Sequence, residues 1–141
     1  MERKQIVLGI ITNANGEVLI IERVKKEQGT DNATLNWAFP GGEEDLDETK
    51  EYAVRREVKE ETGQEVEVEE LISERDHPQF PVHVSYFACR LLSESPFVSH
   101  DPDITKVKWV KPSELNNYFA SNLDENVAKH LGLQKAETGT S

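Results

Sequence analysis

Cysteine, long apolar runs and basic charge are all scarce in this sequence. The single cysteine, Cys89, excludes an internal disulfide and predicts a reducing cytoplasm. It lies in the apolar run VSYFACRL, where we expect a buried core residue rather than a reactive thiol. No apolar run approaches the roughly 20 residues that span a bilayer, and MERKQIVLGI lacks the layout of a secretory leader. We therefore expect a cytoplasmic protein with no membrane partner.

Lysine and arginine number 16 against 27 acids, and the resulting net charge of -11 argues against a nucleic-acid polymer as a partner. A length of 141 residues suits one domain with a real core, and a mean hydropathy of -0.63 is polar without being typical of disorder. We expect a single domain over residues 1–133 and a flexible tail over 134–141. The sequence leaves open whether the protein is a monomer or a homodimer.

Hydrophobic periodicity and turn residues predict a mixed α/β chain. The helix over 50–62 has Thr49 as a candidate N-cap and Gly63 as a candidate C-cap. The polar segments 24–36 and 93–104 are predicted to be loops, and the first is long enough to cover a ligand. This order favours an α/β/α sandwich with a central mixed sheet and helices on both faces. Strands are expected at 5–12, 18–23, 37–42, 65–73, 82–92 and 107–110, and further short helices at 112–119 and 124–132.

Acidic residues are concentrated between positions 43 and 70, which hold 13 of the 27 acids and four bases. One interpretation is a solvated acidic face, and the other is a divalent-cation site, which needs several converging carboxylates. Glu57, Glu60 and Glu61 have the spacing i, i+3 and i+4 that places them on one helix face. Like charges at i and i+4 weaken a helix, and a bound cation would offset this repulsion. The charge pattern alone leaves both interpretations open, and a solvated face is the more common case for a run of charges.

A longer pattern includes these glutamates. Gly42 is followed after five residues by Glu48, and after seven more by REVKEETG at 56–63. This spacing resembles the Nudix box, G-x5-E-x7-R-E-U-x-E-E-x-G-U, in which U is a bulky aliphatic residue. Gln64 departs from it by standing at the last U. The segments WAFPGG, VLIIER and VKWVKPSEL are also similar to segments of the family. The resemblance thus covers most of the chain and implies the Nudix fold.

The loop after the paired glycines differs from the usual family pattern at two positions. Asp45 stands for a glutamate and Asp47 for a glycine. A glycine would permit a positive φ at position 47, which aspartate tolerates less well. The differences bear on the shape of this loop and not on its chemistry.

The resemblance implies a Mg²⁺- or Mn²⁺-dependent pyrophosphohydrolase that acts on a nucleoside diphosphate linked to another group. Divalent ions neutralise phosphate charge and lower the pKa of bound water, and Mg²⁺ prefers oxygen ligands. By analogy with the family, Glu57, Glu60 and Glu61 bind metal, and the carbonyl of Gly41 is a further ligand. Asp103, six residues before Trp109, is an additional candidate ligand, or else a plain loop acid.

The same resemblance suggests the catalytic residues. Glu57 is the first candidate for the general base and Asp103 the second. Arg56 would orient Glu57, and Glu48 would pair with Arg56, either as a structural salt bridge or with a role near the metal.

Three residues are candidates for substrate binding: Gly42, Arg23 and Trp37. Arg23 either binds phosphate or covers apolar surface at a strand end, and Trp37 either borders a base pocket or packs in the core. FPGG and NLDENVAKHLG resemble nucleoside-triphosphate hydrolases of the mutation-avoidance type, so a (d)NTP, including an oxidised one, is the favoured substrate, cleaved to NMP and pyrophosphate. ADP-ribose or a nucleotide sugar is the alternative, and a non-catalytic nucleotide-sensing module is the alternative of another class.

Overall fold

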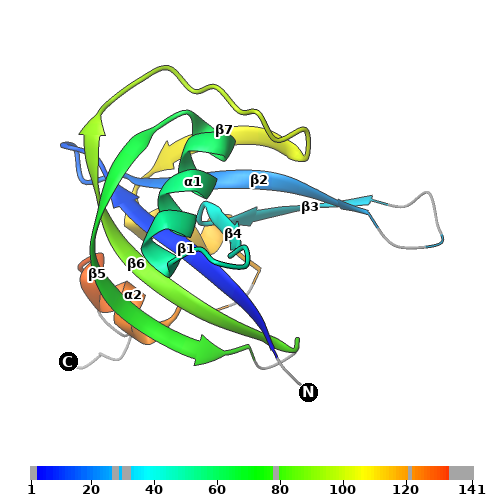
Figure 1. Ribbon diagram of the computed structural model, residues 1–141. Coiled ribbons are helices and arrows are strands. Elements are labelled where there is room, and N and C mark those ends of the chain that lie inside the picture. The colour runs from blue at the N-terminus through cyan, green and yellow to red at the C-terminus, as the bar shows by residue number, and fades with distance from the viewer. Residues whose placement is uncertain (1–2, 27–28, 30–32, 78–79, 121, 134–141) are drawn as a thin grey trace.

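The computed structural model describes residues 3–26, 29, 33–77, 80–120 and 122–133. The tail predicted at 134–141 lies outside the described residues. In this part of the chain the strands are β1 (Lys4–Thr12), β2 (Val18–Lys26), β3 (Ala33–Ala38), β4 (Gly41–Glu43), β5 (Glu65–Asp76), β6 (Val82–Ser93) and β7 (Ile104–Val110). The helices are α1 (Lys50–Thr62), the 3₁₀ helix η1 (Pro112–Asn117) and α2 (Glu125–His130) (Figure 1).

The strands form one mixed sheet. Its main order is β3-β2-β1-β6-β5, with β4 paired to β1 and β7 paired to β2. The pairing of β1 with β6 is parallel, from Lys4↔Val82 to Thr12↔Arg90, and the other pairings are antiparallel. The N-terminal strand is therefore central, so buried apolar side chains are required on both of its faces.

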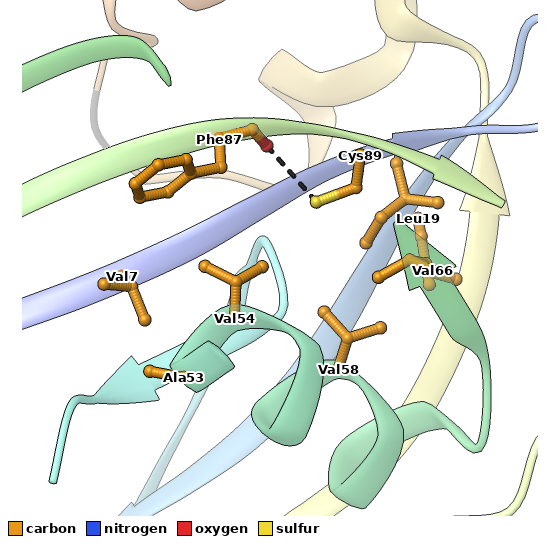
Figure 2. Packing of buried hydrophobic residues seen from close by; sticks show 9 residues of the cluster. Val7, Leu19, Ala53, Val54, Val58, Val66, Phe87 and Cys89 are labelled. Carbon is orange, nitrogen blue, oxygen red and sulfur yellow. Dashed lines mark hydrogen bonds between the residues drawn. The ribbon is translucent and has the colours of Figure 1, made fainter. Parts of the chain in front are cut away.

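Helix α1 covers one face of the sheet. Val54 and Val58 of the helix pack with Val7 of β1 and Leu19 of β2 in one core cluster (Figure 2). Cys89 belongs to this cluster, and its Sγ donates to the carbonyl of Phe87 at 3.6 Å. Burial raises the pKa of the thiol to about 12, which agrees with the prediction of a core residue.

The C-terminal helices cover the other face. Leu115 of η1 and Val127 of α2 are buried in a second cluster with Ile10 of β1 and Ile20 of β2. Adjacent positions of one strand thus point to opposite cores. This arrangement confirms the predicted α/β/α sandwich. No helix in the described part of the chain has the length and apolar character needed to cross a bilayer.

The prediction of a loop over 24–36 is wrong at both ends of this range, because both ends belong to strands. Strand β2 continues to Lys26 and β3 begins at Ala33, and their backbones pair from Ile21↔Ala38 to Lys26↔Ala33. Residues 27–28 and 30–32 lie outside the described residues. The hairpin extends away from the body of the sheet (Figure 1), and residues 34–36 are exposed. The end of β2 beyond Arg23 and the start of β3 are therefore held by backbone pairing and have little of the hydrophobic alternation that predicts a strand.

The predicted strand over 37–42 is in fact two strands. Trp37 and Ala38 end β3, and the chain then crosses through Phe39 and Pro40 to β4, which pairs with β1. Proline lacks the N–H that a continuous strand would use, so the crossing falls where Pro40 stands. The other differences are small: β5 extends to Asp76, and the helix predicted at 112–119 is a 3₁₀ helix that ends at Asn117.

Candidate active site

Helix α1 carries the acidic side chains, and its two ends are fixed locally. Thr49 Oγ1 accepts a hydrogen bond from the backbone N–H of Tyr52 at 3.1 Å, and Gly63 ends the helix with φ 79°. Both predicted caps are confirmed. Since Ala53, Val54 and Val58 turn toward the sheet, the helix is fixed in rotation about its axis. The carboxylates of Glu57 and Glu61 then lie against the paired glycines of β4, the strand that lies beside α1 in Figure 1.

Glu61 is a fully buried carboxylate, with 1% of its surface exposed. Its Oε1 accepts the backbone N–H of Gly41 at 2.9 Å, and its Oε2 is paired with Nη2 of Arg23. Burial raises the pKa of Glu61 to about 7, although the charge of Arg23 and the N–H of Gly41 both act to lower it. A buried acid whose pKa is raised this far is typical of functional sites.

The paired glycines allow two close approaches: Gly41 lets β4 lie against β1, and Gly42 lets the side chain of Glu57 on α1 lie against β4. Gly41 has φ 152°, and a Cβ there would lie 2.0 Å from the carbonyl oxygen of Val7. A Cβ on Gly42 would lie 2.3 Å from Oε2 of Glu57. Any side chain at position 42 would therefore displace the Glu57 carboxylate.

Glu57 is largely buried, with 14% of its side chain exposed. Burial raises the pKa of its carboxyl, and Arg56 partly offsets this rise. The Nη1 of Arg56 lies 3.8 Å from Oε2 of Glu57. Arg56 therefore acts on Glu57 through its charge and does not form a close hydrogen bond with it.

The predicted pairing of Glu48 with Arg56 is present. Arg56 Nε lies 2.5 Å from Oε2 of Glu48 and Nη2 lies 3.0 Å from Oε1, a two-point contact of the geometry that suits guanidinium and carboxylate. The hydrogen bond from Arg56 lowers the pKa of Glu48, and the same bond raises the pKa of Arg56. The contact connects the loop before α1, which carries Glu48, to the middle of the helix, which carries Arg56.

Glu60 is oriented differently from its two neighbours. Its side chain is 48% exposed and accepts Nη1 of Arg56 at 3.3 Å. The three predicted metal-binding glutamates are therefore divided, with two facing inward and one paired on the outside. Among the described residues, no three His, Cys, Asp or Glu side chains are arranged as a group that could hold a metal ion.

A cavity of about 360 Å³ lies beside the inward-facing carboxylates. Arg23 spans it, with Nη1 3.3 Å from Oδ2 of Asp101, Nη2 3.4 Å from the carbonyl oxygen of Gly41, and Nη2 paired with Glu61. The guanidinium of Arg23 thus lies between the carboxylates of Glu61 and Asp101. The polar lining consists of Arg23, Gly41, Gly42, Glu43, Glu57, Glu61 and Asp101.

Asp101 reaches this cavity, and the predicted Asp103 does not line it. The backbone of Asp103 is used otherwise: its N–H donates to Oδ1 of Asp101 at 2.9 Å, and its carbonyl accepts the N–H of Val24 at 2.8 Å. Asp101 is the site residue that the sequence did not identify. The Asp-Pro pair at 101–102 is typical of a turn, but it does not say which acid turns inward.

Trp37 lines a second cavity of about 360 Å³, which shares Leu8, Ala38 and Phe39 with the first. The indole meets the Tyr118 ring edge-on at 5.0 Å between centroids. The same cavity contains Arg75, whose buried Nε makes no hydrogen bond within the described part of the chain. A polar cavity with carboxylates therefore lies next to an aromatic cavity that has a buried donor.

Comparison with known proteins places this site in a family. A family model described as NUDIX domain matches residues 2–131. The chain is similar to a MutT-like protein of Streptomyces ambofaciens, with 35% identity over 114 residues that cover 81% of this chain and 68% of the relative. It is also similar to the 8-oxo-dGTP diphosphatase of Haemophilus influenzae, with 34% identity over 96 residues and 67% of each chain covered.

The fold agrees with these relatives. A NUDIX hydrolase from Nitrosomonas europaea superimposes with a TM-score of 0.76 over 97% of this chain and 95% of the other, at 18% identity. The chain belongs to the Nudix hydrolase family.

Proposed function

We propose that this protein is a Mg²⁺- or Mn²⁺-dependent nucleotide pyrophosphohydrolase that cleaves a (d)NTP, including an oxidised one, to NMP and pyrophosphate. The observation that carries this proposal is the convergence of Glu57, Glu61 and Arg23 on one cavity that adjoins a second, aromatic one. The first suits a polyphosphate chain because Arg23 and carboxylates line it, and the second suits a nucleoside because aromatic rings line it.

The donors in the first cavity fit a hard divalent cation. The carboxylates of Glu57 and Glu61 and the carbonyl of Gly41 all line it, and all are oxygen ligands. Burial raises the pKa of both carboxyls, so their negative charge is incompletely compensated by the protein alone. We propose that these groups hold the metal and that Glu60, exposed beside Arg56, joins them.

A bound divalent cation supplies charge neutralisation on the phosphates and a water of lowered pKa. Glu57 then serves as the general base, because it faces the cavity and burial raises the pKa of its carboxyl. Arg56 orients Glu57 and is itself held by Glu48. Arg23 binds phosphate, since its guanidinium already spans the cavity.

The second cavity supports a nucleotide substrate. Trp37 and Phe119 line it and offer faces or edges to a base. The Nε of Arg75 makes no hydrogen bond within the described part of the chain and lies 3.9 Å from Oδ2 of Asp124, so it can offer a donor. The similarity to an 8-oxo-dGTP diphosphatase favours a nucleoside triphosphate over ADP-ribose.

The test is a panel of dNTPs, oxidised dNTPs, ADP-ribose, sugar nucleotides and dinucleoside polyphosphates with Mg²⁺ or Mn²⁺, and the products are resolved by chromatography. We expect metal-dependent release of pyrophosphate and NMP from a triphosphate. Preferred turnover of ADP-ribose would reassign the substrate, and no turnover of any member would favour a nucleotide-sensing module.

The base is tested separately. We expect Glu57→Gln to lower kcat about 10²–10⁴-fold, because the amide cannot accept the proton of the attacking water. Glu51→Gln, an exposed glutamate in the first turn of the same helix, is the matched control and should leave kcat unchanged. A wild-type kcat for Glu57→Gln in saturating Mg²⁺ would remove Glu57 from this role.

A further inference from the structure

The segment between β6 and β7 is exposed for most of its length, yet it lies in a defined path along the end of α1. The backbone N–H of Val98 donates to the carbonyl of Thr62 at 3.1 Å, and that of His100 donates to the carbonyl of Glu60 at 2.7 Å. The last carbonyls of a helix have no partner within the helix. This segment satisfies two of them and is thereby attached to the acidic end of α1.

A third attachment comes from a side chain. Gln64 is completely buried, and its amide forms a reciprocal pair with the backbone of Ser95: Nε2 donates to the Ser95 carbonyl at 2.8 Å, and Oε1 accepts the Ser95 N–H at 3.0 Å. This is the residue that stands where the Nudix box has an aliphatic side chain. A buried amide is costly unless it is hydrogen-bonded, and here both of its ends are used.

The path of this segment delivers Asp101 to the cavity. Asp101 follows His100 directly, and its carboxylate holds Nη1 of Arg23 at 3.3 Å. Arg23 therefore has two carboxylate partners, Glu61 and Asp101. When Glu61 binds another partner, Asp101 is the group that keeps the guanidinium in the cavity.

We propose that Gln64 is a positioning residue: its amide fastens the segment 94–101 to the end of α1, so that Asp101 holds Arg23 where it meets phosphate. The proposal rests on the proposed function in taking phosphate as the ligand of Arg23. An aliphatic residue at position 64 would fill the same volume but leave the two backbone hydrogen bonds of Val98 and His100 as the hydrogen bonds that attach the segment to the end of α1. Gln64 thus contributes to substrate binding rather than to the packing of the core.

The experiment compares Gln64→Met, Asp101→Asn and the double variant. Methionine keeps the unbranched shape of glutamine and forms neither hydrogen bond with Ser95, which is near enough to the surface to be rehydrated. Glu94→Gln is the matched control, because this exposed residue lies in the same segment. Two readouts are measured: amide hydrogen exchange of the segment in the free protein, and the affinity for pyrophosphate in the presence of Mg²⁺ by calorimetry.

We expect Gln64→Met to accelerate exchange at Val98 and His100 about tenfold, since it removes one anchor of a locally opening segment. Asp101→Asn should weaken pyrophosphate binding about tenfold, the cost of one charge-assisted hydrogen bond. Gln64→Met should weaken binding in the same direction, and the double variant should match Asp101→Asn. In turnover assays KM should rise while kcat stays within about twofold.

Three results would overturn the proposal: unchanged exchange in Gln64→Met, effects of the two substitutions that add in the double variant, or a fall in kcat with KM unchanged. Exchange and pyrophosphate binding require no turnover. An inactive wild-type protein would therefore refute the proposed function and leave these two readouts to decide the role of Gln64.

Discussion

Asp47 lies in the loop between β4 and α1 in a backbone conformation that favours glycine. Its φ is 73°, and among the described residues it is the only residue other than glycine with a positive φ. The sequence raised this possibility, because the family has a glycine at the position. The structure shows that the conformation is kept although the glycine is not, so the loop retains its course at a local cost.

Substitution of Asp47 measures how much the positive φ lowers the free energy of unfolding. We expect Asp47→Gly to be more stable than Asp47→Ala by about 1 kcal/mol, because the left-handed region is open to glycine and strained for alanine. Urea unfolding of the two variants and the wild type checks it, with the wild type falling between them since aspartate tolerates this region better than alanine does. Equal stability of the alanine and glycine variants would contradict a positive φ in solution.

At the scale of the element, α1 could be predicted almost completely and β3 could not. The signals for α1 are local: Thr49 and Gly63 cap it, and its apolar spacing identifies the buried side. Strand β3 carries the exposed Thr34, Leu35 and Asn36 and is defined only by its pairing with β2. A strand that forms because it pairs with another part of the chain is difficult to predict from its own residues.

The same distinction applies to the candidate site. The contact between Glu48 and Arg56 is expected from the resemblance to the Nudix box, lies within one loop and the helix that follows it, and is found as predicted. In the β6–β7 segment the resemblance to the family favours Asp103, which stands six residues before Trp109, whereas the structure has Asp101 in the cavity. The course of that segment depends on contacts with α1, such as the pair of Gln64 and Ser95, which are 31 residues apart. No local pattern carries that information.

Helix α1 also provides the element-scale test of the cation site. We expect Mg²⁺ to raise the Tm, because a ligand that binds only the folded state at ten times its Kd adds about 1.4 kcal/mol, or a few degrees. Glu60→Gln with Glu61→Gln should abolish the rise by removing two carboxylates of the site. Differential scanning calorimetry with and without Mg²⁺ is the measurement.

The matched control for this test is Glu51→Gln with Glu94→Gln, which removes the same charge from two exposed positions outside the cavity. It should retain the Mg²⁺-dependent rise. A wild-type Tm that does not respond to Mg²⁺, or a control that loses the response, would count against a site on α1.

On the scale of the whole molecule, the protein carries a net charge of -11 and still buries Glu61, whose carboxylate contacts the backbone N–H of Gly41 and the guanidinium of Arg23. Such a charge makes the folded state sensitive to further ionisation. The Glu61 carboxyl is fully buried, and its pKa is raised from an ordinary value of 4.5 to about 7 by that burial. The global stability of the metal-free protein should therefore depend on whether this one group is ionised.

The direction of that dependence follows from proton linkage. Because the folded protein holds the Glu61 proton more tightly than the unfolded chain does, the contribution is complete below about pH 4.5 and is lost as the pH rises through about 7. We expect the wild type to lose on the order of 3 kcal/mol relative to Glu61→Gln across this interval, since each pKa unit corresponds to about 1.4 kcal/mol. Urea unfolding in EDTA at pH 5, 6, 7 and 8 measures it.

Glu48→Gln separates this effect from ordinary carboxylate titration. The hydrogen bond from Arg56 lowers the pKa of Glu48, so the stability from this group is present above its ordinary pKa and is lost as the pH falls. The Glu48 variant should therefore differ from the wild type mainly at neutral pH and keep the decline between pH 5 and 7. Parallel curves for the wild type and Glu61→Gln would show that Glu61 is already ionised at pH 5, and that Arg23 and Gly41 compensate its charge fully without a metal.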